Sequence, residues 1–222
     1  MDIFSYTGKG LREKNEDYLI CRELTDKGIL CVVADGMGGY SFGEEASRIV
    51  ADTIYQTLLV SSIDDIDAAV SCANNALFTY KQTKHINATG CTIAGAIIRD
   101  RKAKVFWAGD SRFYLFRGNR IIYQTEDHSL VNEMRQVRVL TPEQIERYEH
   151  IVRRSIMGSQ DDVVDISIIT IEPGDDILIC TDGLYKDMPA ELAIMKLREQ
   201  GHAFSVDNDK FRDNHSLIYI SL

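Results

Sequence analysis

Four acidic clusters lie where apolar runs of the sequence begin or end. They are Asn15-Glu16-Asp17, Asp35-Gly36, Asp182-Gly183 and Asp213-Asn214. Carboxylates at strand ends cost stability when they are buried, unless a positive charge neutralises them. If several converged on one place they would repel one another without a cation, and oxygen-rich sites suit Mg²⁺ or Mn²⁺. The pattern therefore indicates a divalent-metal site assembled from distant parts of one sheet-based fold. The alternative is that each Asp-Gly pair is only a turn.

The composition is typical of an ordinary globular protein. The chain has 222 residues, of which 45% are hydrophobic and 27% charged, and no linker divides it, so we expect a single domain over 1–222. Acidic residues exceed basic ones by 34 − 25, which gives a net charge of −9. This balance argues against a nucleic-acid or anionic-membrane partner, because both need clustered Lys and Arg. It does not argue against a phosphate substrate, because bound metal reverses the local field.

The cysteine content and the hydropathy of the chain indicate its cellular compartment. None of the five cysteines forms a CxxC pair, and the odd count weakens a disulfide framework, so we expect mostly buried, reduced thiols. The N-terminus has no basic start, and no segment approaches the ~20 apolar residues of a membrane-spanning helix. The sequence thus predicts a cytoplasmic protein.

The elements that would position the acidic clusters follow from hydrophobic periodicity. Short apolar or alternating runs predict strands at 3–7, 18–22, 29–34, 92–98, 103–108, 113–117, 120–124, 163–171, 177–181 and 214–222. Apolar residues at helical spacing predict helices over 46–58, over 66–77 with Asp64 as N-cap, and over 189–199. The two long helices are inserted together rather than alternating with strands, so we expect an α+β fold of helices packed on mostly antiparallel sheets.

Read in order, the motifs resemble those of the metal-dependent type 2C protein serine/threonine phosphatases, in their bacterial form. The matching blocks are 12–17, 33–39, 89–92, 108–112, 127–129, 154–158, 180–184 and 212–214, which together span nearly the whole chain. Any one block is weak evidence, whereas the ordered set is strong. The resemblance implies a four-layer α/β/β/α sandwich, with two mostly antiparallel sheets flanked by helices and the metals at one edge. It also implies a flap beside the active site, here a short one at 128–151.

The resemblance further implies a role for each matching residue. Asp35 would bridge two metal ions and Gly36 would offer its carbonyl oxygen, while Asp182 and Asp213 would hold one ion. Glu16 would bind near the other ion, directly or through water, with Asp17 in the water shell. Asp110 would combine with Asp182 to hold a third ion, and Arg12 would hold the substrate phosphate. The expected cofactors are therefore two Mn²⁺ or Mg²⁺ ions, with a third at Asp110, and the expected catalytic residues are Arg12 and Asp35.

Hydrolysis of a phosphate monoester requires the same kinds of group, whatever the family. Hydrolysis of a phosphate monoester is among the slowest biological reactions without help. Two metals ~3.5–4 Å apart can lower the pKa of a shared water and clamp the phosphate. Arginine can hold two phosphate oxygens at once, which lysine cannot. We therefore expect hydrolysis of phosphoserine and phosphothreonine in proteins by a metal-activated water, with no Cys or Ser nucleophile.

Four departures from the family pattern affect this expectation. Met37 follows the second motif where animal members commonly have His, and packing is its simplest interpretation. His215 stands where an aliphatic residue is usual, and on a strand it would share a face with Asp213, near the metals. The segment between Asp182 and Asp213 is short, with room for one helix where two are common. The flap is short as well, and in this family such a loop helps to choose the substrate.

Two other functions remain compatible with the sequence. One is a catalytically weak regulatory or binding module of the same fold, although no acidic cluster is lost. The other is a small-molecule phosphomonoesterase, whose metal centre would be the same. Family resemblance favours phosphoprotein substrates, with a Hanks-type kinase or its targets as the expected partners.

Overall fold

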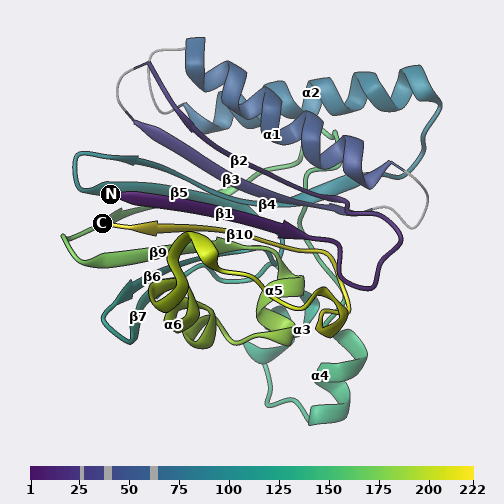
Figure 1. Ribbon diagram of the computed structural model, residues 1–222. Coiled ribbons are helices and arrows are strands. Elements are labelled where there is room, and N and C mark those ends of the chain that lie inside the picture. Colours follow the sequence, from purple (N-terminus) through teal and green to yellow (C-terminus); the bar gives the residue numbers. More distant parts are fainter. Residues whose placement is uncertain (26–27, 38–41, 61–64) are drawn as a thin grey trace.

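Two five-stranded sheets, packed face to face, form the centre of the computed structural model (Figure 1). The structure describes residues 1–25, 28–37, 42–60 and 65–222. Gly38 and Gly39 of the second motif and the expected N-cap Asp64 lie outside these residues.

All strand pairs of the two sheets are antiparallel. In order across it, the first sheet contains β1 (Asp2–Gly8), β10 (His215–Ser221), β9 (Asp175–Cys180), β6 (Arg112–Arg117) and β7 (Arg120–Gln124). The second contains β2 (Asp17–Glu23), β3 (Ile29–Met37), β4 (Gly90–Arg99), β5 (Lys102–Ala108) and β8 (Asp165–Thr170). The strands at the centre of each sheet are buried nearly throughout, as continuous apolar runs predict.

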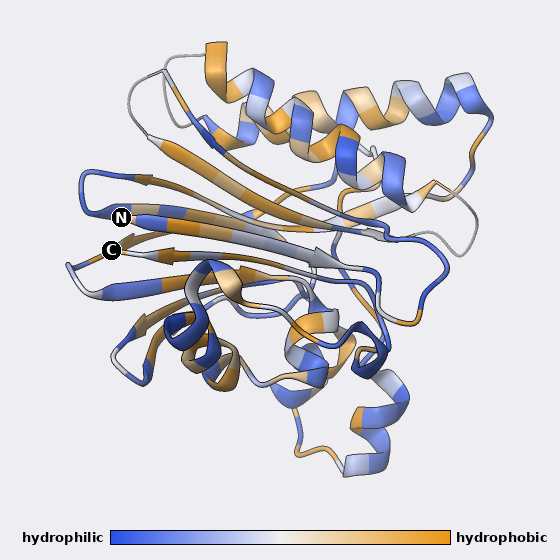
Figure 2. Cartoon of the chain, in the orientation of Figure 1, coloured by the Kyte–Doolittle hydropathy of each residue, from blue (hydrophilic) through white to orange (hydrophobic). Residues whose placement is uncertain are grey.

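Helices cover the outer face of each sheet. The helices α1 (Gly43–Val60) and α2 (Ile66–Lys84) pack on the second sheet, and α5 (Asp182–Asp187) and α6 (Ala190–Gln200) pack on the first. A third apolar layer fills the space between the sheets. In Figure 2 orange, hydrophobic residues are concentrated along the central strands, whereas the helices carry both orange and blue residues. The expected four-layer α/β/β/α sandwich is confirmed.

Two further helices, α3 (Leu130–Arg135) and α4 (Pro142–Tyr148), form the expected flap region, beyond the end of the sandwich (Figure 1). Thr141 begins α4 with a capping box, in which its hydroxyl accepts from the Gln144 amide and the Gln144 side chain accepts from the Thr141 amide. The base of the flap is closed by an isolated bridge between Ser129 and Val152.

The structure corrects three expectations about local structure. The N-cap of α2 is Asp65, whose side chain accepts from the Ala68 amide. Between Asp182 and Asp213 lie two helices, α5 and α6, rather than one, followed by 3₁₀ turns at Gly201–Ala203 and Asn208–Lys210. The third correction is that neither Asp-Gly pair is a turn. Asp35 and Gly36 belong to β3, and Asp182 and Gly183 begin α5.

The cysteines differ in part from the expectation of buried thiols. Cys21 and Cys31 are register partners on β2 and β3, with their Cα atoms 4.2 Å apart, and they form a disulfide. Cys91 and Cys180 are buried free thiols, and Cys72 is a free thiol on the surface. The strand register brings the first two together, and sequence spacing alone did not reveal it. No helix within the described ranges is long and apolar enough to cross a membrane.

Candidate metal centre

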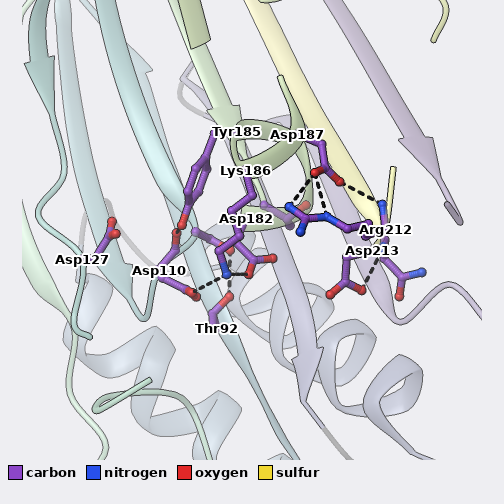
Figure 3. Close-up of polar contacts among 12 residues, drawn as sticks. Thr92, Asp110, Asp127, Asp182, Tyr185, Lys186, Asp187, Arg212 and Asp213 are labelled. Carbon is purple, nitrogen blue, oxygen red and sulfur yellow. Dashed lines mark hydrogen bonds and ion pairs between the residues drawn. The ribbon is translucent and has the colours of Figure 1, made fainter. Parts of the chain in front are cut away.

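A cavity of about 760 Å³ opens where β3 and β9 end. The lining residues come from segments that are far apart in the sequence: Arg12, Glu13, Lys14, Glu16, Asp35, Gly36, Met37, Thr92, Asp110, His150, Val152, Asp182, Lys186, Asp213 and Asn214. All four acidic clusters contribute to this list, together with Asp110 and Arg12. Figure 3 shows how the side chains of Asp110, Asp182 and Asp213 are gathered from separate elements.

Asp35 lies near the end of the central strand β3. Its register partners are Asp17 on β2 and Thr92 on β4, so two carboxylates face each other across neighbouring strands. Like charges placed directly opposite destabilise a sheet. The Thr181 hydroxyl donates to Asp17 Oδ2 at 2.8 Å, but the buried Asp17 Oδ1 has no hydrogen-bond partner among the described residues.

Glu16 and Gly36 meet at the start of α1. The Gly36 amide donates to the Glu16 carbonyl at 3.1 Å, and the Ser47 hydroxyl donates to the same oxygen at 2.7 Å. A Cβ on Gly36 would lie 2.3 Å from the carbonyl oxygen of Gly43, so only glycine fits this close backbone approach. The Glu16 carboxylate rests against Gly43 itself, and burial raises its pKa.

Asn214 ties the loop that carries Arg12 and Glu16 to the start of β10. Its Oδ1 accepts from the Glu16 amide at 2.8 Å, and its Nδ2 donates to the carbonyls of Lys9 and Lys14 at 2.8 Å each. Beside it, Arg12 Nη2 donates to Asp213 Oδ2 at 2.7 Å. The loop and the segment at Asp213 are therefore held together by hydrogen bonds from one asparagine side chain and one arginine.

Asp182 is the first residue of α5, directly after β9. The next residue, Gly183, lies against the segment before β10. A Cβ at this position would be 1.9 Å from the Asn214 carbonyl oxygen. At the other end of α5, Asp187 accepts from the backbone amide of Arg212 at 2.8 Å and pairs with its guanidinium (Figure 3). The helix is thus fixed at both ends against the segment that carries Asp213.

Asp110 is held by the other side of α5. The Tyr185 hydroxyl donates to the Asp110 carbonyl at 2.9 Å, and the Arg112 guanidinium stacks on the Tyr185 ring at 3.6 Å. Arg112 in turn makes a bidentate pair with Asp127, with distances of 2.6 and 2.7 Å. This chain of contacts fixes the backbone of Asp110 relative to the cavity.

Several carboxylates are brought together in and beside the cavity. Burial first, and neighbouring carboxylates second, raise the pKa of Asp35 well above its ordinary value. Burial likewise raises the pKa of Asp17 and that of Asp110 to about 7, and in both the charge of Asp182 adds to the shift. Burial disfavours the Lys186 ammonium, but the charges of Asp182 and Asp110 outweigh it and the pKa of Lys186 is raised.

These residues fit a hard divalent cation. The donors are carboxylates and one backbone carbonyl, the type that Mg²⁺ and Mn²⁺ prefer. Asp17 has an oxygen with no partner among the described residues, and burial raises the pKa values of Asp17, Asp35 and Asp110, so a bound cation would stabilise their charged forms. In the described part of the chain, no three His, Cys, Asp or Glu side chains are arranged as a ready-made metal site. Arg12 and Lys186 instead each pair with a cavity carboxylate.

Two predicted residues lie outside the cavity lining. Asp17, the first residue of β2, is buried and accepts a hydrogen bond from the Thr181 hydroxyl. His215 is fully buried, and its ring stacks on Phe211 with centroids 4.0 Å apart. The expectation that His215 shares a face with Asp213 assumed one continuous strand. β10 begins only at His215, so the alternation of faces does not reach back to Asp213.

Sequence reasoning missed three residues that line the cavity: Lys186 on α5, and His150 and Val152 at the base of the flap. Lys186 lies one helical turn after Asp182, a spacing that pairs opposite charges once α5 is recognised as a helix. No sequence signal points to His150 or Val152, because the flap folds over the cavity only through tertiary contacts. Met37 lines the cavity as well.

Comparisons with known proteins show the family of this chain. Residues 11–213 match the family model of protein phosphatase 2C. The protein phosphatase PhpP of Streptococcus pneumoniae is 30% identical over 195 residues, which cover 83% of this chain and 79% of PhpP. The serine/threonine phosphatase of S. agalactiae has the same fold, with a TM-score of 0.85, 23% identity and coverage of 100% of this chain and 99% of that one.

A further solved structure is the catalytic domain of the serine/threonine protein phosphatase PstP in complex with two manganese ions. It superposes with a TM-score of 0.81 at 24% identity and covers 98% of this chain and 96% of that one. The family model spans every acidic cluster described above, and the fold is shared over the full length. The chain therefore belongs to the protein phosphatase 2C family.

Proposed function

We propose that this chain hydrolyses phosphoserine and phosphothreonine in proteins with the help of divalent ions held in the cavity. The observation that carries the proposal is the convergence of Asp35, Asp110, Asp182 and Asp213, from four separate segments, on one cavity with Arg12 at its rim. Membership of a family of metal-dependent protein phosphatases supports it.

The proposed ion ligands are those that the family resemblance implies and that line the cavity. Asp35 would serve both ions and Gly36 would offer its carbonyl oxygen, while Asp182 and Asp213 would hold one of the ions. Glu16 would serve the other, with Asp17 behind it in the outer shell. Mn²⁺ or Mg²⁺ bound by this set would lower the pKa of a water and polarise the phosphate. The charge of the ions would also remove the repulsion that raises the pKa values of the aspartates.

Arg12 is the residue that we propose binds the substrate phosphate. Its side chain is 61% exposed, and it donates to Asp213 through Nη2. A guanidinium has five N–H donors, so others remain to hold two phosphate oxygens while this contact persists. Asn214 would position Arg12, because its side chain is hydrogen-bonded to the backbone of the loop that carries Arg12.

The substrate class and the setting are further parts of the proposal. We propose phosphoproteins as substrates, made by Hanks-type serine/threonine kinases, and a cytoplasmic location. The support for this is the family and its protein-phosphatase relatives. The flap would contribute to substrate choice, because His150 and Val152 bring it to the wall of the cavity.

Phosphate release from peptides tests the substrate class. Wild-type protein with Mn²⁺ would be given matched phosphothreonine, phosphoserine and phosphotyrosine peptides and a set of small phosphomonoesters. We expect kcat/KM to be highest for the first two. Asp35→Asn should abolish release, by at least about 10³-fold, whereas Asp67→Asn, an exposed change on α2, should not. A preference for a small metabolite over every peptide would contradict the protein substrate.

A further inference from the structure

Lys186 lies between two of the cavity carboxylates. Its Nζ is hydrogen-bonded to Asp182 Oδ2 and is 3.9 Å from Asp110 Oδ2. Figure 3 shows the amino group with an aspartate on either side. The family resemblance assigns this gap, between Asp110 and Asp182, to a third metal ion. In this chain a side chain of the protein already brings positive charge there.

The position of Lys186 is built into α5. Asp182 begins the helix and Lys186 follows one turn later, the spacing at which an acidic and a basic side chain pair along a helix. The neighbouring Tyr185 holds the backbone of Asp110 through its hydroxyl. Both partners of the lysine are therefore fixed by the same short helix, and the side chain of Lys186 is only 31% exposed.

We propose that the ammonium of Lys186 takes the place of a third divalent ion between Asp110 and Asp182, so that the centre binds two ions rather than three. The inference rests on the metal centre proposed above. A third ion held by Asp110 and Asp182 would lie where the ammonium already is, and the two cations would repel each other at that distance. A third ion would have to displace a tethered ammonium that is already within hydrogen-bond distance of one ligand.

Asp110 then acts as a positioning residue for Lys186. In this arrangement it neutralises the lysine together with Asp182, and it does not ligate an ion of the wild-type centre. The ammonium also remains at the cavity wall when the ions leave. The metal-free protein thus keeps one positive charge beside Asp182 and another, Arg12, beside Asp213.

The number of Mn²⁺ ions bound per chain tests the inference directly. It would be measured by titration calorimetry and by metal analysis after equilibrium dialysis, for wild type and for Lys186→Gln, Lys186→Arg and Lys14→Gln. We expect two ions in wild type, in Lys186→Arg and in Lys14→Gln, whose lysine lines the same cavity. Lys186→Gln should bind a third ion, at least about tenfold more tightly than wild type does. Two ions in Lys186→Gln, or three in wild type, would overturn the inference.

A second variant keeps the inference testable if Lys186→Gln does not fold. Asp110→Asn should leave the wild-type count at two, and a loss of one ion would show that Asp110 is a ligand and would refute the proposal. Asp35→Asn distinguishes a failure of the proposed metal centre from a failure of the proposal for Lys186. If wild type binds two ions and Asp35→Asn binds fewer, the metal centre stands whatever Lys186 does. If wild type binds none, the centre and the inference both fail.

Discussion

Asp17 and Asp35 face each other across β2 and β3, where Asp17 is buried and Asp35 lines the cavity. Such a pair costs stability unless a cation compensates it, and Arg12 and Lys186 pair with other carboxylates of the cluster. The side chains that could serve catalysis are therefore also those that destabilise the metal-free fold. Function and stability are linked at these residues through the divalent ion.

This linkage predicts how the stability of the metal-free protein changes with pH. The pKa of Asp17 and that of Asp110 are about 7 in the folded protein, against an ordinary value of 3.8. Between these values the folded chain binds more protons than the unfolded chain, so stability falls as pH rises. The penalty is absent below pH 3.8 and complete above pH 7. From pH 5 to 7 each group should contribute a loss of about 2 kcal/mol, and the two losses need not add.

Urea unfolding with chelator at pH 5, 6 and 7 measures this loss. Asp110→Asn should show a smaller decline, and saturating Mn²⁺ should remove most of it. Stability that stays level or increases across this window in chelator would contradict the burial of uncompensated carboxylates.

Replacing Arg12 tests its proposed contact with the substrate phosphate. Arg12→Lys keeps the charge but loses the planar fork that can hold two phosphate oxygens. We expect kcat/KM for an aryl phosphate to fall about 10- to 100-fold, mainly through a higher KM. Arg120→Lys, an exposed change on β7 outside the cavity, serves as the matched control. Equal kinetics for Arg12→Lys and wild type would remove Arg12 from phosphate binding.

At the scale of elements, α5 decides the geometry of the centre. It carries Asp182 and Lys186 into the cavity, holds Asp110 through Tyr185, and is tied to Arg212 at its far end. All of this depends on the close approach of Gly183 to Asn214. A helix of six residues thus positions acids that come from three different segments.

Gly183→Ala tests the role of this contact. The new Cβ would meet the Asn214 carbonyl oxygen at 1.9 Å, so the helix has to shift. We expect a loss of about 3 kcal/mol in the free energy of unfolding, and weaker Mn²⁺ binding. In the control Gly174→Ala the Cβ meets nothing within 4 Å, and the positive φ of 86° should cost about 1 kcal/mol with Mn²⁺ binding unchanged. Equal effects of the two changes would show that the close approach is unimportant.

The elements that the sequence predicts well are those with long periodic patterns. The apolar runs predict the strands, and the helical spacing of Ala46, Val50 and Ile54 predicts α1, because each pattern reports burial on one or both faces. The six residues of α5 are too few for a periodic signal, so the pairing of Lys186 with Asp182 was missed as well. The partnership of Cys21 with Cys31 depends on strand register, which composition does not specify.

At the scale of the whole molecule, the sandwich gathers distant segments at one end. Acidic residues from positions 16 to 213 line one cavity only because β3, β9 and β10 end or begin there. The polar residues at strand ends predict which acids converge, since strand ends of a packed sheet share an edge. The hydrogen-bond and ion-pair partners of these acids depend on tertiary contacts, which the sequence pattern does not specify. The same is true of the placement of the flap and of the burial of His215 outside the cavity lining.

The most direct test of the account is hydrolysis of an aryl phosphate by wild type, Asp35→Asn and Asp182→Asn. Each would be assayed with Mn²⁺, with Mg²⁺ and with chelator, after circular dichroism has shown that it is folded. We predict turnover by wild type that chelator abolishes and added metal restores, and no turnover above background in either variant. Turnover that survives the chelator, or that persists in both variants, would contradict a metal centre built on these aspartates.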